Sequence, residues 1–107
     1  MKVLLDNCVP KNLANRITGH WVEHASTRGW SALSNGRLLA AAKDAGFEAM
    51  LTTDRSIEHQ QGSFPIPVVV VDSLFNAVDD LVKYLPTMLA LLNQPLQARV
   101  YVIPRIQ

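Results

Sequence analysis

The sequence predicts one small α/β domain in which helices cover both faces of a mainly parallel sheet of about five strands. Short apolar runs alternate along the chain with longer segments whose apolar residues recur at helical spacing. Four consecutive valines, Val68 to Val71, form the strongest strand signal, and such a run is typical of a strand that is buried on both faces. We therefore expect the element order β-α-β-α-β-(α)-β-α-β in a three-layer α/β/α arrangement.

Composition limits the class of protein. The 107 residues fit a single domain, and 49% hydrophobic with 18% charged residues suits a globular core. The formal net charge of +1 lacks the basic excess that marks many nucleic-acid binders, and the single cysteine cannot form an internal disulfide. The first apolar run ends at Asp6, too early for a signal peptide or a membrane span, so we expect a cytoplasmic protein that does not enter a membrane.

The first quarter of the chain predicts a strand, a helix and a second strand. The apolar run Val3–Leu5 is the first strand. Pro10 suits the first turn of a helix, and Gly19 suits its end. Residues 20–25 are expected to form the second strand. The inward stripe of the intervening helix consists of Val9, Leu13 and Ile17.

The next segment predicts a loop, a helix and a third strand. Residues 28–32 are expected to form the loop, and Ser34 is a candidate N-cap for the helix that follows. The third strand spans residues 48–53 and ends in Asp54. The expected helix ends at Gly46, and its apolar stripe consists of Leu38, Leu39, Ala42 and Ala45.

The second half of the chain predicts two strands and one long helix. Residues 55–61 fit either a short helix or an irregular loop. The valine strand ends in Asp72, and residues 98–103 form the last strand. A long helix bent at Pro86 lies between these strands. Its apolar residues at helical spacing are Leu74, Val78, Leu81, Val82, Leu85, Leu89 and Leu92.

Three of the expected strands end in an acid, namely Asp6, Asp54 and Asp72. Ligands of open α/β sheets bind beyond the carboxyl ends of the strands, where neighbouring acids repel one another unless a hard cation such as Mg²⁺ or Mn²⁺ lies between them. Such a cation activates water for phosphodiester cleavage. The structural alternative is that these acids start turns or helices, and for Asp72, followed by Ser73 and a helix, capping is the preferred interpretation.

Two segments of the chain resemble small bacterial PIN-like proteins related to toxin nucleases. Leu4–Pro10, with the sequence LLDNCVP, resembles the L-L-D-x-x-x-P opening of that group. Leu51–Arg55, with the sequence LTTDR, resembles its later hydrophobic-T-x-D segment. The loop around Gly29 and the helix from Ser34 match the group in order and approximate spacing. The resemblance covers roughly residues 2 to 72.

The resemblance implies a single PIN-like domain over residues 1–107, with divalent-metal-dependent ribonuclease activity of toxin–antitoxin type. Asp6 and Asp54 would be the catalytic residues and would hold Mg²⁺ or Mn²⁺. Asn35 stands where relatives carry an acid, and it would be a weak third ligand through its carbonyl oxygen. An antitoxin-type protein partner and a homo-oligomeric state, such as a homodimer, are also expected.

The chain departs from the group at two acidic positions, which leaves a second interpretation open. Besides Asn35, Ser56 stands where relatives carry an acid two positions past the later Asp. Glu58 and Glu48 are candidate substitutes, although neither lies at the expected spacing. With two clear acids, the chain is alternatively a catalytically degenerate PIN-like module that acts through protein–protein binding. The long apolar helix is the expected partner surface for that role, through Met88, Leu89, Leu91 and Leu92.

Several further side chains are candidates for the site. His59 follows Asp54 and is a candidate for acid–base chemistry, whereas Cys8 is interpreted as a small buried residue. Trp30, in a loop, is expected to be more exposed than Trp21. Basic residues near the acidic end would hold an RNA backbone, and an ordinary solvated surface is the alternative. These residues are Lys11, Arg16, Arg28, Arg37 and Arg55, of which Lys11, Arg37 and Arg55 are the main candidates.

Overall fold

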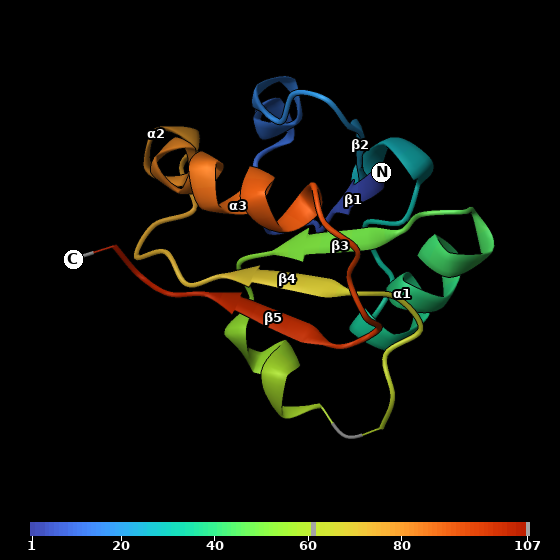
Figure 1. Ribbon diagram of the computed structural model, residues 1–107. Coiled ribbons are helices and arrows are strands. Elements are labelled where there is room, and N and C mark those ends of the chain that lie inside the picture. The colour runs from blue at the N-terminus through green and yellow to red at the C-terminus, as the bar shows by residue number, and fades with distance from the viewer. Residues whose placement is uncertain (61, 107) are drawn as a thin grey trace.

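A single parallel sheet organises the chain. The computed structural model describes residues 1–60 and 62–106. Five strands pair in the order β2-β1-β3-β4-β5, and every pair is parallel (Figure 1). The predicted class, a mainly parallel sheet of about five strands in an α/β/α arrangement, is therefore confirmed. The strands are β1 (Lys2–Leu5), β2 (Trp21–His24), β3 (Ala49–Thr52), β4 (Val68–Val71) and β5 (Val100–Ile103).

The direction of the chain across the sheet reverses beside β1. From β1 the chain passes to β2 at one edge and then returns to the other side of β1 to form β3. Leu5 of β1 lies in register with His24 of β2 and with Leu51 of β3. The strands on either side of this reversal therefore end at the same level, which is the usual place for a ligand in an open α/β sheet.

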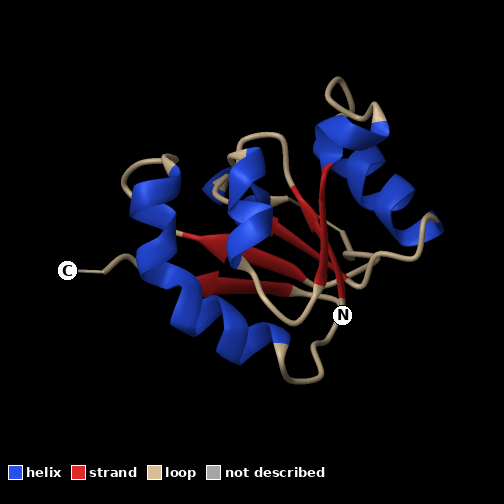
Figure 2. Cartoon of the chain, turned by 90° about the horizontal axis from the view of Figure 1, so that it is seen from above, coloured by secondary structure: helices blue, strands red, loops and turns tan. Residues whose placement is uncertain are grey.

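Alternating side chains divide the core into two layers, because successive residues of a strand point to opposite faces. One layer packs beneath η1 (Lys11–Arg16), α2 (Val78–Leu81) and α3 (Leu85–Leu92), and its sheet residues include Val3 and Leu5. The other layer, which includes Leu4, packs against η2 (Ala25–Arg28), α1 (Asn35–Asp44) and η3 (Arg55–His59). Figure 2 shows helices flanking the strands in the view from above.

The continuous apolar runs explain the buried strands. Each residue of β3 and β4 is buried, and the four valines of β4 have no exposed surface. β4 lies between β3 and β5, where it has a neighbour on each side. The prediction that the valine run forms an interior strand is confirmed.

The long helix begins later than the sequence predicts. Leu74 is 64% exposed and lies in the loop after β4, whereas helical structure starts at Val78. The helical segment consists of α2, a 3₁₀ turn η4 (Val82–Tyr84) and α3. The 3₁₀ turn immediately precedes the turn with Pro86, which has no N–H for a regular helical bond.

The long helix also does not present its apolar residues as a free surface. Met88 and Leu92 are buried in the layer against the sheet, and Leu89 and Leu91 are partly buried there. The expectation of a partner surface around this helix is therefore wrong for its inward residues, because packing on the sheet already covers them. Among the described residues, no helix has the length and apolar character needed to cross a membrane.

The remaining helices lie where the sequence predicts them, but not all of them are α-helices. The segment after Pro10 is a 3₁₀-helix rather than an α-helix, although Leu13 and Ile17 face inward as expected. α1 follows Ser34, whose side chain makes no capping hydrogen bond, and the chain turns at Gly46 with φ +85°. The segment after Asp54 is the short helix η3, and position 61 of the expected range lies outside the described residues.

Candidate functional site

Asp6 and Asp54 follow the ends of two neighbouring strands. Asp6 comes directly after β1, and Asp54 lies two residues past the end of β3. The backbone N–H of Asp6 donates to the carbonyl oxygen of Leu51 at 2.9 Å, which extends the β1–β3 pairing up to the acid. Both acids therefore lie at the carboxyl edge of the sheet, beside the strand reversal, as the sequence predicts for ligand-binding residues.

A buried hydroxyl joins the two acids. The Oγ1 of Thr52 donates to Oδ2 of Asp6 at 2.8 Å and accepts from the backbone N–H of Asp54 at 3.0 Å. Thr52 has no exposed surface. The only sign of Thr52 in the sequence is that it is a polar residue at the end of an otherwise apolar strand. This threonine fixes the Asp6 carboxylate relative to the backbone that carries Asp54.

Asp6 is held from a second side by the turn that follows it. It is 6% exposed, and its Oδ1 accepts from the backbone N–H of Asn7 at 2.7 Å. The amide of Asn7 donates to the carbonyl oxygens of Trp30 and Ser31 at 3.3 and 3.5 Å. The turn after β1 is therefore attached to the loop before α1, and Asn35 begins α1 directly after that loop.

Hydrogen bonds from Ser56 favour the ionised form of Asp54. Its Oδ1 accepts from the side chain and the backbone N–H of Ser56 at 2.7 and 2.9 Å. The Ser56 hydroxyl, then its backbone N–H and the Asn35 side chain, lower the pKa of Asp54 against the opposing effect of burial. Asn35, predicted as a third ligand, is thus close to Asp54, and Ser56 orients this carboxylate in place of the acid expected there.

Cys8 belongs to the same cluster of polar atoms. Its sulfur lies 3.4 Å from Oγ1 of Thr52 and accepts from Oγ1 of Thr53 at 3.3 Å. The sulfur also lies 3.8 Å from Oδ2 of Asp6. Cys8 is half-buried rather than fully buried, so the interpretation as a small buried residue holds only in part.

The third strand-end acid has a different role. Asp72 does not cap the following helix, since that helix starts at Val78 with Ala77 at its N-cap. Instead Asp72 forms ion pairs with Arg55 at 3.2 Å and with Arg105 at 3.1 Å. The capping prediction is wrong because the helix starts later than its apolar periodicity suggests.

Of the two candidate substitute acids, Glu58 is engaged by a base and Glu48 lies at the far end of the sheet from Asp6 and Asp54. Glu58 forms an ion pair with Arg55 at 3.4 Å. Glu48 precedes β3, and its carboxylate accepts from the backbone N–H of Lys2 at 2.9 Å. Because Lys2 begins β1, Glu48 lies at the amino end of the sheet, opposite the candidate site. Glu48 is therefore excluded as a ligand alongside Asp6 and Asp54.

The candidate RNA-binding cations divide into two groups. Lys11 begins η1 and Arg37 lies in the first turn of α1, and both are exposed. Arg55 is engaged by Glu58 and Asp72, and Arg28 forms an ion pair with Glu23 at 2.7 Å. Lys11 and Arg37 thus remain the better candidates for phosphate contacts.

The aromatic expectation is reversed. Trp30 is half-buried and packs edge-on against Phe47, with 6.2 Å between ring centroids, whereas Trp21 on edge strand β2 is 64% exposed. Trp30 packs against the core layer that includes Leu38 of α1 and Phe47, so its position in a loop does not predict its exposure. His59, at the end of η3, is exposed as a solvated histidine would be.

The site offers the donor types that a hard divalent cation prefers. Asp6 and Asp54 provide carboxylate oxygens, and Asn35 provides an amide oxygen. The hydrogen bonds that Asp6 accepts from Asn7, Thr52 and Cys8 use part of the roughly four lone-pair sites of a carboxylate. Within residues 1–60 and 62–106, no group of three or more His, Cys, Asp or Glu is arranged to hold a metal. The donor set therefore fits Mg²⁺ held by one or two carboxylates together with water or substrate oxygens, rather than a cage built by the protein.

Comparisons with protein-family models, curated proteins and solved structures found no match to this chain.

Proposed function

We propose that this protein is a divalent-metal-dependent ribonuclease of toxin–antitoxin type, with a PIN-like site in which Asp6 and Asp54 hold Mg²⁺ or Mn²⁺. The observation that carries the proposal is the placement of these two acids at the ends of neighbouring strands, joined through Thr52. The resemblance of Leu4–Pro10 and Leu51–Arg55 to PIN-like proteins supports the same residues independently.

The chain's own groups have distinct roles in this proposal. Hydrogen bonds from Ser56 lower the pKa of Asp54 and so favour the negatively charged form of its carboxyl. Thr52 and the backbone of Asn7 fix the orientation of the Asp6 carboxylate. Preorganisation of this kind avoids the cost of reorienting charged groups during the reaction. The two acids would therefore present a fixed pair of ligands at the sheet edge.

A bound divalent cation would supply an activated water and stabilise the charge that develops on the scissile phosphodiester. The chain needs no side-chain nucleophile for this chemistry. The exposed cations Lys11 and Arg37 would bind the RNA backbone through its phosphates. Asn35 donates to Asp54 through its amide N–H, so its amide would have to turn to offer the oxygen as a neutral ligand.

Cleavage of labelled single-stranded RNA with Mg²⁺ or Mn²⁺, and with a chelator, tests the proposal. Asp6→Asn and Asp54→Asn should each lower the cleavage rate by at least about 100-fold, since loss of a metal-stabilised charge costs several kcal/mol. Asp79→Asn, which changes an exposed acid on α2, is the matched control and should keep wild-type activity. Equal cleavage by wild type and Asp6→Asn would trace the activity to a contaminant and contradict the assignment.

A catalytically silent PIN-like module is the second candidate function. It is favoured by Asn35 and Ser56, which stand where acids are expected, and by the Ser56 hydrogen bonds that engage Asp54. This function would operate through contacts with another copy or with an antitoxin-type protein. It predicts no metal response of the wild type and no effect of Asp6→Asn on partner binding.

A further inference from the structure

A pocket lies beyond the carboxyl ends of β4 and β5, at the edge of the sheet that also carries Asp6 and Asp54. Its apolar lining consists of Leu74, Phe75 and Ile106, which are 64%, 59% and 52% exposed. Exposed apolar groups gathered in one place are typical of a binding surface. We call this space, of about 230 Å³, the Phe75 pocket; its other lining residues are Ser73, Asp80, Lys83, Tyr84 and Arg105.

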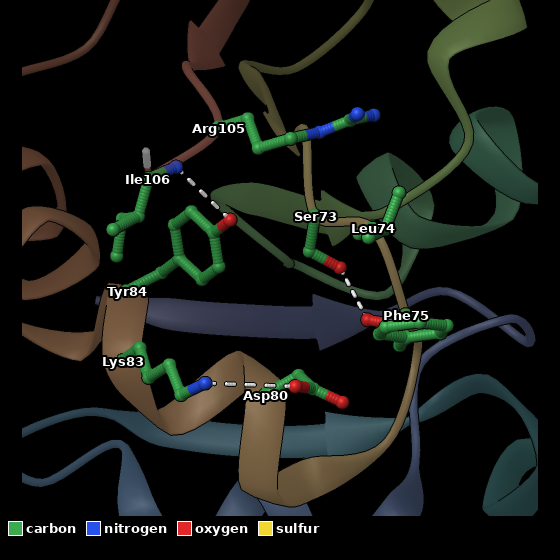
Figure 3. A pocket seen from close by; sticks show the side chains of 8 residues that line it. All are labelled: Ser73, Leu74, Phe75, Asp80, Lys83, Tyr84, Arg105 and Ile106. Atoms are coloured by element: carbon green, nitrogen blue, oxygen red, sulfur yellow. Dashed lines mark hydrogen bonds and ion pairs between the residues drawn. The ribbon is translucent and has the colours of Figure 1, made fainter.

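Hydrogen bonds fix two sides of the Phe75 pocket. The hydroxyl of Ser73 donates to the carbonyl oxygen of Phe75, and the backbone N–H of Ile106 donates to the hydroxyl of Tyr84 at 3.2 Å. Figure 3 shows Leu74 and Phe75 on one side of the pocket and Tyr84 with Ile106 on the other. The volume is below the roughly 300 Å³ at which pockets for drug-sized ligands begin. The pocket therefore suits a flat group of the size of one nucleobase, stacked on the Phe75 ring, better than a helix of a partner protein.

The charged residues that line the pocket are two bases and one acid, which favours an anionic ligand. Lys83 lies 3.7 Å from Asp80 in an exposed pair that water screens, and the Lys83 side chain is 63% exposed. Among the described residues, Arg105 donates to Asp72 alone, through Nη2, and its side chain is 45% exposed. Because a guanidinium has five N–H donors, most of those of Arg105 remain available to a phosphate.

Two ion pairs lead from the proposed catalytic site to this pocket. Arg55 directly follows Asp54 and donates to Oδ2 of Asp72 at 3.2 Å. Arg105 donates to Oδ1 of the same carboxylate at 3.1 Å. In the sheet, only β4 separates β3, which precedes Asp54, from β5, which precedes Arg105. The ends of β3 and β5 are therefore roughly 10 Å apart, a distance that a few nucleotides of a single strand can span.

We propose that the Phe75 pocket is a second contact site for single-stranded RNA, in which an unpaired base stacks on Phe75 and the adjoining phosphates bind Arg105 and Lys83. An aromatic ring beside basic groups is the combination with which proteins hold single strands at little sequence preference. Since only an unpaired base can stack on the ring, the pocket selects single-stranded over duplex RNA. This assignment rests on the proposed ribonuclease function and adds to it a preference for unpaired substrate.

Binding of a labelled single-stranded RNA of about 12 nucleotides, followed by fluorescence anisotropy in the presence of a chelator, tests the stacking contact. Phe75→Leu keeps an apolar side chain and removes the ring, so it should raise the dissociation constant by at least about 5-fold. Trp21→Leu is the matched control, because Trp21 is 64% exposed at the opposite end of the sheet, and it should leave the affinity unchanged. Equal affinity of wild type and Phe75→Leu, or tighter binding of a duplex of the same sequence, would overturn the proposal.

The salt dependence of the same binding tests the phosphate contacts. For single strands, the logarithm of the binding constant falls with the logarithm of salt concentration by about 0.7 for each phosphate that the protein neutralises. Arg105→Gln should therefore make this slope shallower by about 0.7, whereas Phe75→Leu should leave it unchanged. Arg99→Gln is the matched control, since Arg99 and Arg105 are both exposed and flank β5 at opposite ends. A slope that Arg105→Gln leaves unchanged would contradict the phosphate contact, and circular dichroism of each variant verifies its fold.

Failure of the pocket and failure of the proposed ribonuclease are distinguishable, because binding in a chelator does not need the metal site. Asp6→Asn should bind the RNA at least as tightly as wild type while it loses cleavage. Cleavage that depends on Asp6, together with an RNA affinity that Phe75→Leu leaves unchanged, would overturn the pocket alone. RNA binding that depends on Phe75, without metal-dependent cleavage, would support the pocket and overturn the ribonuclease. Self-association that Phe75→Leu abolishes at unchanged RNA affinity would identify a protein interface instead and overturn the RNA contact.

Discussion

Thr52 donates its hydroxyl proton to the Asp6 carboxylate at 2.8 Å, in a place where Thr52 has no exposed surface and Asp6 has 6%. The same oxygen accepts from the backbone N–H of Asp54 at 3.0 Å. Buried polar groups are costly unless they are paired. These two hydrogen bonds therefore offset the cost of burying the Thr52 hydroxyl and the Asp6 carboxylate, and they fix Asp6 relative to the backbone of Asp54. Thr52 therefore connects the candidate site to the buried strand β3.

Thr52→Val tests that dependence, since it keeps the shape of the side chain and removes the hydroxyl. The free energy of unfolding should fall by about 1–3 kcal/mol, because a buried carboxylate loses a donor. Urea denaturation measures the change. Thr53→Val is the matched control: Thr53 is half-buried and donates only to the Cys8 sulfur, so its loss should cost about 0.5 kcal/mol or less. Equal stability of wild type and Thr52→Val would show that the bridge is not structural.

Ser56→Ala should raise the pKa of Asp54 toward its ordinary value, because the serine hydroxyl is the largest cause of its lowering. An NMR titration of the Asp54 carboxyl carbon measures this change. Thr87→Ala, on the exposed side of α3, is the control and should leave that titration unchanged. An unchanged titration midpoint in Ser56→Ala would disprove the assigned cause.

The lowered pKa of Asp54 also predicts how the stability difference between wild type and Ser56→Ala depends on pH. A carboxyl whose pKa is lowered by folding stabilises the native state above its unfolded pKa of about 4, and that contribution is lost as the pH falls through the lower folded pKa. Wild type should therefore be more stable than Ser56→Ala at neutral pH, and this part of the difference should shrink below about pH 4. A difference in unfolding free energy that grows on acidification would reverse the predicted sign.

Gly46→Ala should destabilise the protein by about 1 kcal/mol. Gly46 adopts φ +85° where the chain leaves α1, and a Cβ there would meet no atom within 4 Å, so the cost would come from backbone strain alone. Gly36→Ala is a control of opposite sign, because Gly36 lies in α1 with open space around it. That change should be neutral or stabilising by up to about 1 kcal/mol, as measured by thermal unfolding. A loss of stability in both variants would exclude φ as the cause.

Local sequence predicted the strands well because burial leaves a direct trace in composition. The runs Val3–Leu5 and Val68–Val71 are continuous because both faces of their strands are covered. The order of the strands could not be predicted in this way, since connections of these lengths permit a crossover to either side of β1. The start of the long helix was misplaced because Leu74 continues the periodicity of α2 by chance while its side chain faces solvent.

The sequence predicts the two acids of the candidate site and Asn35, but not the hydroxyl groups that hold the acids. Asp6 and Asp54 could be found because each ends an apolar strand, and the parallel sheet brings such ends to one edge. Thr52 could not be distinguished from an ordinary strand threonine without knowing that Asp6 lies opposite it. Ion pairs of Arg55 and Asp72 likewise depend on which side chains meet across the loops, which sequence spacing does not specify.

Calorimetric titration of Mn²⁺ into metal-stripped protein tests the central claim most directly. Asp72→Asn serves as the matched control, because Asp72 also ends a strand but is paired with Arg55 and Arg105. Saturable binding to wild type and to Asp72→Asn, with loss of binding in Asp6→Asn, is the predicted result. No saturable binding to wild type at millimolar metal would contradict the metal site at Asp6 and Asp54, and with it the proposed ribonuclease.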